Sequence, residues 1–95
     1  MQVQVLGMVW YRPETYAELK AMFEDGHKLH ASYEEWLSAA ENGRKQMEAR
    51  GAHVVCVDID PKTFPGWCKE RGLKLDANAR NEYASLFARK SLDHA

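Results

Sequence analysis

The segment from His53 to Asp60 constrains the fold of this chain more than any other, because its body is apolar on both sides. Between Val54 and Val57 the side chains alternate between the two faces of an extended chain, and all of them are valine or cysteine. A strand that is apolar on both faces needs cover on both, or cover on one face and a partner chain. The segment therefore predicts the central strand of the fold, with Cys56 buried and unreactive inside it.

Helix signals precede this strand. Ser32 is followed three residues later by Glu35, which is the pattern of a capping box at the start of a helix. An apolar stripe continues from there to Arg50, and Gly51 is the residue type favoured at the left-handed position that follows a helix. The spacing predicts that the longest helix lies between Ser32 and Arg50.

Two prolines shape the segment that follows the strand. Asp60 and Pro61 form a pair suited to the start of a helix, but Pro65 would clash with the preceding turn if the helix had already begun. We therefore expect a tight turn up to Phe64. The regular helix starts there or at Pro65 and ends at Gly72.

The two ends of the chain give weaker signals. Met8 to Tyr11 predicts the first strand. Residues 2–7 either extend this strand, with a break at Gly7, or belong to a loose arm over residues 1–7. A short helix is predicted over residues 13–24, and Asp76 is expected to cap the last helix. The tail at residues 92–95 is expected to fray.

The order of these elements predicts one α+β domain over residues 1–95, with two strands and four helices in the order β-α-α-β-α-α. The direction of the first strand stays open. Two strands make a marginal sheet, and pairing between chains would complete a four-stranded sheet in a homodimer. Trp36, Gly43 and Met47 share one stripe of the long helix and are candidates for the subunit interface, with core packing as the alternative for Trp36.

Charge and apolar runs narrow the class of protein. The net charge is −1, so no global positive field favours nucleic acid or an anionic membrane surface. No signal peptide is visible, and no apolar run nears the roughly 20 residues that span a bilayer. The two cysteines do not form the disulfide framework of a secreted domain. We expect a soluble cytoplasmic protein without a membrane partner.

Three blocks of the sequence resemble a family of small, uncharacterised bacterial proteins. The blocks are DGHKL at residues 25–29, YEEWL at residues 33–37, and IDP, FPGWC and RGL between residues 59 and 73. The resemblance covers most of the chain from Met8 onwards. It implies no activity, cofactor, partner or site residue.

Asp58 and Asp60 are the first candidate ligand-binding residues. In alternating geometry their carboxylates share a face at the carboxyl end of the strand, where sites in α/β sheets tend to collect. A structural role is the alternative for both, because Asp60 suits the cap before Pro61 and Asp58 can mark the point where the strand leaves the core.

His27, His30 and Cys68 complete the set of candidate ligand-binding residues. The H-x-x-H spacing can bring two imidazoles to one metal ion, but a convincing motif supplies four ligands, so no metal or cofactor is predicted. Solvated loop histidines are the alternative. Cys68 is expected to be the more accessible cysteine, since Lys69 and Arg71 follow it and a nearby cation lowers the pKa of a thiol. Packing in the core is the alternative there.

No catalytic triad, phosphate loop, complete metal set or cofactor fingerprint is present, so the leading hypothesis is a small non-enzymatic binding or interaction module. One alternative is a small enzyme or ligand-binding protein with a pocket near Asp58 and Asp60. Another is a weak nucleic-acid-binding regulator, which the interspersed glutamates disfavour. Its basic surface would combine Arg12 with Lys69, Arg71, Lys74 and Arg80.

Overall fold

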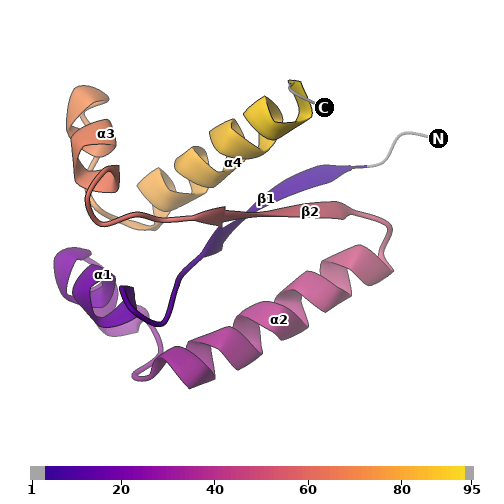
Figure 1. Ribbon diagram of the computed structural model, residues 1–95, viewed down its shortest axis with the longest axis horizontal. Coiled ribbons are helices and arrows are strands. Elements are labelled where there is room, and N and C mark those ends of the chain that lie inside the picture. Colours follow the sequence, from indigo (N-terminus) through magenta and orange to yellow (C-terminus); the bar gives the residue numbers. More distant parts are fainter. Residues whose placement is uncertain (1–3, 94–95) are drawn as a thin grey trace.

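The computed structural model describes residues 4–93, with side chains up to residue 90, and it confirms the predicted α+β order (Figure 1). Within these residues two strands, four α-helices and one short 3-10 helix follow one another. They are β1 (Val5–Trp10), α1 (Tyr16–Met22), η1 (Gly26–Lys28), α2 (Tyr33–Ala49), β2 (His53–Asp58), α3 (Phe64–Glu70) and α4 (Ala77–Asp93).

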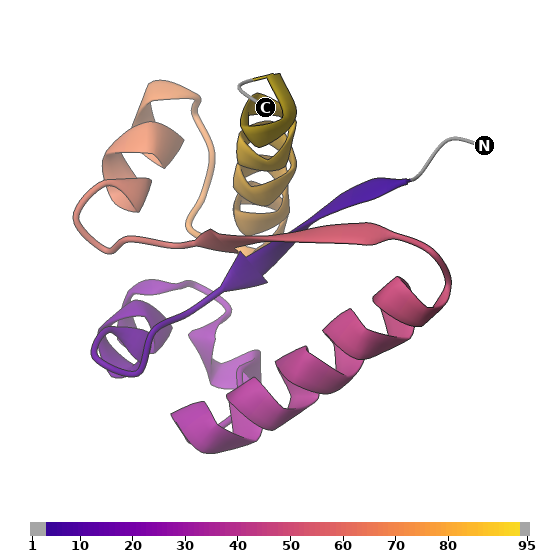
Figure 2. The ribbon, with the colours of Figure 1, turned by 45° about the vertical axis from the view of Figure 1, so that its right-hand side comes forward.

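The two strands are parallel, which the sequence had left open. Val5 lies opposite His53 and Trp10 lies opposite Asp58, with no interruption between these pairs. Helix α4 covers one face of the sheet and α2 lies on the other, as both ribbon views show (Figures 1 and 2). Helices α1 and α3 lie beyond the carboxyl ends of the strands, so that end of the sheet is flanked by two helices.

Local signals fix the ends of the helices as predicted. The Ser32 side chain accepts a hydrogen bond from the backbone N–H of Glu35 at 3.2 Å, so it caps α2. Gly51 follows that helix with φ +94°, which is the left-handed conformation that favours glycine. Before α4, the Asp76 Oδ1 atom accepts a hydrogen bond from the N–H of Ala79 at 3.0 Å.

The turn after β2 also has the expected form. The Asp60 carboxylate accepts a hydrogen bond from the N–H of Lys62 at 2.8 Å, and its carbonyl accepts one from the N–H of Phe64 at 2.9 Å. Helix α3 begins at Phe64, so Pro65 occupies the first turn, where its missing N–H breaks no helical hydrogen bond.

At the ends of the chain, residues 5–7 belong to β1, so the strand includes this part of the possible arm, and α4 continues through Asp93. Gly7 marks no break in the strand. A Cβ atom at this position would lie 2.3 Å from the backbone oxygen of Ala84, so a glycine is required for α4 to pack this closely on β1. Residues 1–3, 94 and 95 of the expected arm and tail lie outside the described residues.

Aromatic side chains make up much of the core, and Tyr11 lies near its centre. Its ring centroid lies 4.8 Å from that of Trp36 and 6.1 Å from that of Phe23, and Phe23 in turn contacts Phe64 at 6.0 Å. Only 8% of Trp36 is exposed, so core packing accounts for this residue and leaves little of it for a second subunit. Gly43 faces the Met8 side chain of β1, while Met47 is half-buried.

The prediction that Cys56 is buried is wrong. Its side chain is exposed, because on this face of the sheet α2 packs against Met8 of β1 and leaves the neighbouring Cys56 of β2 uncovered. Although β2 is apolar on both faces, the helices of this chain therefore do not bury all of its side chains. Among the described residues, no helix combines the length and the hydropathy needed to cross a membrane.

We expect Gly7→Ala to lower the free energy of unfolding by about 3 kcal/mol, because the new methyl group must push α4 away from β1. Gly66→Ala in α3 is the matched control, since a Cβ atom there has no neighbour within 4 Å. The control should be neutral or should stabilise the fold by up to about 1 kcal/mol. Urea unfolding followed by circular dichroism measures both changes, and equal effects of the two substitutions would contradict the tight contact.

Candidate functional site

A pocket of about 470 Å³ lies where both strands end, and we call it the strand-end pocket. Asp58 and Asp60, which the sequence had singled out, both line it, and they are joined there by Arg12 from the segment after β1. The parallel direction of the strands explains this meeting, because both carboxyl ends then open on the same side. The other polar residues of the lining are Thr15, Glu18, Lys62 and Thr63.

Arg12 and Asp58 form an ion pair across the mouth of this pocket. Nη2 of Arg12 lies 2.7 Å from Oδ2 of Asp58, and Nε lies 3.1 Å from the same oxygen. The hydrogen bond to Asp58 raises the pKa of Arg12 above its ordinary value. Both side chains are well exposed, at 65% for Arg12 and 45% for Asp58, so the pair adds little to stability. Oδ1 of Asp58 has no hydrogen-bond partner among the described residues, and it can accept one from a ligand.

Asp60 serves two purposes. One of its oxygens holds the turn before α3 by accepting from Lys62, so the structural role expected for this residue is present. The residue also contributes to the lining of the pocket, so the turn positions a carboxylate there.

The strand-end pocket has a polar rim and an apolar floor. Its lining contains three carboxylates and two cations, which gives it a formal charge of −1. The floor is made by the buried side chains of Ile59 and Tyr83 together with Pro61. Such a site can hold a small molecule that carries a positive group on a short apolar body.

The other candidate residues from the sequence do not join this site. His27 and His30 are exposed and lie outside its lining. Within the part of the chain that the structure describes, no three His, Cys, Asp or Glu side chains are grouped so that they could hold a metal ion. Cys68 is only 1% exposed, and burial raises the pKa of its thiol. The expectation that Cys68 is the accessible cysteine is therefore wrong, because it packs in the core and its neighbours Lys69 and Arg71 are exposed.

A second correction concerns Arg80, which was expected on a basic surface. Only 6% of it is exposed, and its guanidinium group forms a two-pronged ion pair with Asp25 at distances of 2.8 and 3.0 Å. The hydrogen bonds from Arg80 lower the pKa of Asp25 below its ordinary value. Arg80 also lies 4.4 Å from the centroid of the Phe23 ring. Burial beside this pair raises the pKa of Tyr11 to about 12.

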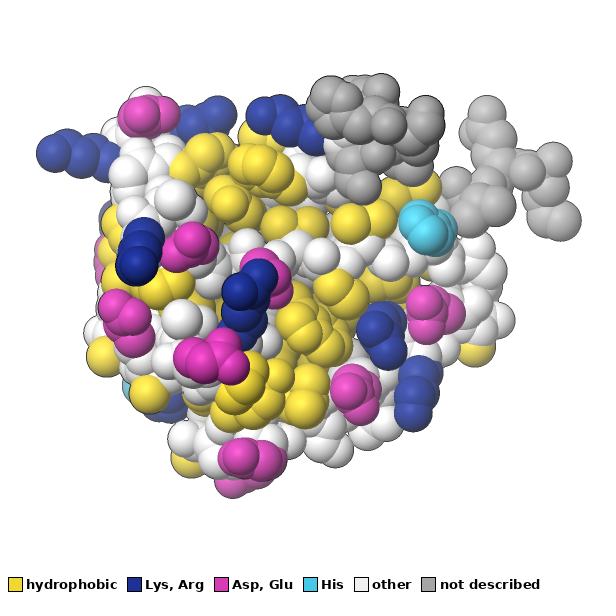
Figure 3. Space-filling view, viewed as in Figure 1, with side chains coloured by type: hydrophobic (Ala, Val, Ile, Leu, Met, Phe, Trp, Pro, Cys, Tyr) yellow, Lys and Arg dark blue, Asp and Glu magenta, His cyan; other side chains and the backbone are white. Residues whose placement is uncertain are grey.

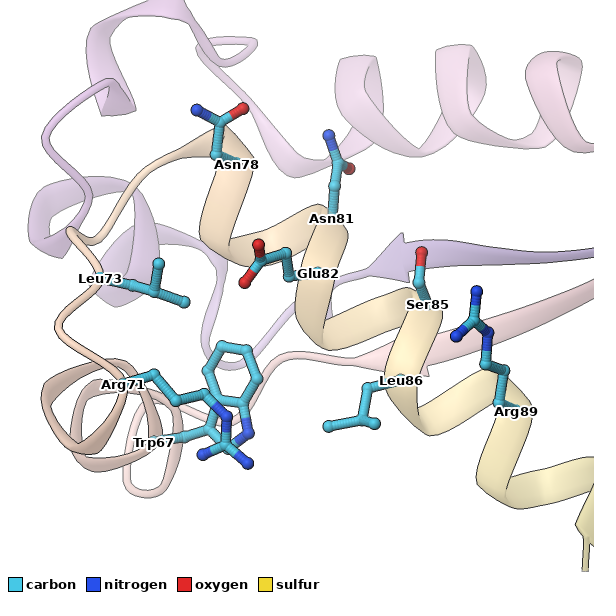
Figure 4. A pocket seen from close by; sticks show the side chains of 9 residues that line it. All are labelled: Trp67, Arg71, Leu73, Asn78, Asn81, Glu82, Ser85, Leu86 and Arg89. Atoms are coloured by element: carbon cyan, nitrogen blue, oxygen red, sulfur yellow. The ribbon is translucent and has the colours of Figure 1, made fainter.

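Sequence reasoning missed a second concavity, the groove between α3 and α4 (Figure 4). Its volume is about 690 Å³. Trp67 and Arg71 from α3 and its C-terminal end form one wall, and a stripe of α4 from Asn78 to Arg89 forms the other. The signal in the sequence was a second stripe at helical spacing on α4, but its partner wall becomes visible only when the two helices are placed in space.

No protein-family model, no curated protein and no solved structure matches this chain.

We expect Asp25→Asn to lower the free energy of unfolding near neutral pH by about 3 kcal/mol, because it leaves the buried charge of Arg80 without a carboxylate. The ordinary pKa of the Asp25 carboxyl is 3.8, and its value in the folded protein is lower. The stabilisation by the pair is therefore fully present above pH 3.8 and is lost as the pH falls below it. The variant should lack this acid-dependent loss.

Urea unfolding of both proteins, at neutral pH and at several values below pH 3.8, measures the difference. Asp58→Asn is the matched control, since that carboxylate is exposed and its loss should change stability far less. The same pH dependence in the wild-type protein and in Asp25→Asn would show that the pair contributes nothing to it.

Proposed function

We propose that the protein is a small non-enzymatic binding module that holds an amine-bearing molecule in the strand-end pocket. The observation that carries the proposal is that Asp58, Asp60 and Glu18 line one pocket with an apolar floor at the carboxyl end of both strands. The volume of about 470 Å³ lies in the usual range of small-molecule sites. The two cysteines of the protein are free, which supports the cytoplasm as its proposed location.

The chemistry of recognition follows from the rim. An ammonium group can donate to Oδ1 of Asp58 and to the carboxylate of Glu18, while a short hydrocarbon body contacts Ile59 and Tyr83. Charge-assisted hydrogen bonds of this kind are among the stronger polar contacts in proteins. Arg12 works against the bound cation, because it already shares Asp58 and adds a positive charge to the rim.

The two alternatives have less support. An enzyme would need an activated nucleophile or a free acid–base pair in the pocket, whereas Asp58 is paired with Arg12 and Asp60 holds the turn before α3. A nucleic-acid-binding surface would need clustered cations. Arg80 is buried in an ion pair and Arg12 is paired with Asp58, which leaves fewer of the expected cations for phosphate groups.

Three probes with one four-carbon body test the ligand class, namely n-butylamine, n-butanol and butyrate. We expect n-butylamine to bind tightest and to shift the backbone amide signals of residues 58–63 in NMR titrations. Asp58→Asn should weaken its binding by about tenfold, whereas Arg12→Gln should strengthen it. Both residues are exposed, so both variants should fold.

Glu34→Gln is the control, since Glu34 is an exposed carboxylate outside the pocket lining. Equal binding of the three probes would refute the proposal, and so would tighter binding of butyrate. Amide shifts that avoid residues 58–63 would also count against it.

We also propose that the protein forms a homodimer through the outer edge of β2. The N–H groups of His53 and Ile59 donate to the carbonyls of Gln4 and Trp10, at 2.7 and 3.1 Å. Because backbone groups alternate along a strand, Val54 and Cys56 direct theirs away from β1. His53, Cys56 and Asp58 are exposed, whereas every residue of β1 is half-buried, so β2 has the more accessible edge.

The dimer can be tested at Cys56. Antiparallel pairing of two β2 strands about a two-fold axis at this residue brings the two Cys56 Cα atoms to about 5.5 Å, within reach of a disulfide. We expect light scattering at micromolar concentration to give twice the chain mass of 10.9 kDa, and mild oxidation to cross-link the chains. Cys56→Ser should keep the dimer without the cross-link, while Cys56→Lys should yield monomers. A wild-type mass of 10.9 kDa would contradict the proposal.

A further inference from the structure

The groove between α3 and α4 is a trough that lies open to solvent (Figure 4). Hydrophobic side chains gather between these two helices on the face shown in Figure 3, with both cationic and acidic side chains around them. At about 690 Å³ it is larger than the strand-end pocket, and its lining includes none of the residues of that pocket. It is therefore a separate surface.

A polar stripe runs along α4 at the border of this trough, on the side of the helix away from Trp67 (Figure 4). Asn78, Asn81 and Ser85 recur at helical spacing, and Arg89 ends the stripe. Eleven residues separate Asn78 from Arg89, which at 1.5 Å per residue corresponds to about 16 Å. An extended peptide of about five residues has the same length. The carboxamide groups of the two asparagines can each donate to and accept from the backbone of such a peptide.

The opposite wall supplies an unpaired donor. Nε1 of Trp67 is buried and has no hydrogen-bond partner within the described chain. The guanidinium group of Arg71 lies over the indole ring, 4.4 Å from its centroid. Besides this stacking, Arg71 makes a weak contact of 3.9 Å with the exposed Glu70. A small movement of Arg71 therefore opens the indole N–H to an acceptor such as a peptide carbonyl.

The net charge of the trough favours a partner of opposite charge. Arg71 and Arg89 stand at its two ends, and Glu82 is the one carboxylate in its lining. Its formal charge is therefore +1. Between the charges, Leu73, Leu86 and the face of Trp67 form an apolar strip.

From this geometry we infer that the groove between α3 and α4 binds an extended acidic peptide segment that carries apolar side chains at alternate positions. The acidic side chains pair with Arg71 and Arg89, the peptide backbone pairs with Asn78, Asn81 and the indole N–H of Trp67, and the apolar side chains contact the leucines. This is a second binding activity, and it does not depend on the strand-end pocket.

A fluorescein-labelled peptide of alternating glutamate and leucine tests the inference, compared with matched peptides in which lysine or serine replaces glutamate. Fluorescence anisotropy should show the glutamate peptide binding about tenfold more tightly than the serine peptide, with affinity falling as salt is added. The lysine peptide should bind weakest. In NMR spectra the indole N–H signal of Trp67, assigned with Trp67→Phe, should shift on binding.

Arg71→Gln and Arg89→Gln should each weaken the glutamate peptide several-fold. Lys69→Gln is the matched control, because Lys69 is an exposed cation next to the groove that does not line it. Asp58→Asn should also leave peptide binding unchanged, which separates this activity from that of the strand-end pocket. The inference is overturned if the three peptides bind alike, if none binds, or if Lys69→Gln weakens binding as much as Arg71→Gln. A shift of the Trp67 signal on concentration of the protein alone would identify a second copy as the occupant and would also overturn it.

Discussion

The contact between Gly7 of β1 and the backbone of α4 at Ala84 sets the distance between the sheet and its last helix. Two strands have too little area to bury a core by themselves, so the fold depends on close cover from helices. At this separation α4 directs one stripe at the sheet and a second stripe towards α3. It also places Arg80 beside Asp25, where the two side chains form the buried ion pair. The groove and the buried ion pair both involve α4, so both depend on where this helix lies.

Short-range chemistry made much of the fold predictable. The cap at Ser32, the left-handed Gly51, the turn at Asp60 and the start of α3 at Phe64 each depend on residues within a few positions of one another. Such signals act through local hydrogen bonds and backbone sterics, so they can be recognised from the sequence alone. The pair of carboxylates at the end of β2 was visible for the same reason.

Long-range features were not predictable in this way. Arg12 joins Asp58 only because the strands are parallel, and the sequence leaves the direction of β1 open. Arg80 resembles any exposed helical cation until Asp25, 55 positions earlier, is placed beside it. The sequence predicted a buried Cys56 and an accessible Cys68, and the structure shows the reverse. The local sequence pattern contains no information on how far helices cover β2 or on how deeply α3 is buried.

The ion pair between Asp25 and Arg80 has a consequence for how the protein folds during its synthesis. The two β-α-α halves share one order of elements, yet Asp25 of the first half is paired with Arg80 of the second. Neither half is therefore a self-sufficient repeat. During synthesis the sheet face that α4 covers stays open, and the Asp25 carboxylate stays without Arg80, until α4 has been made, so the core closes only then.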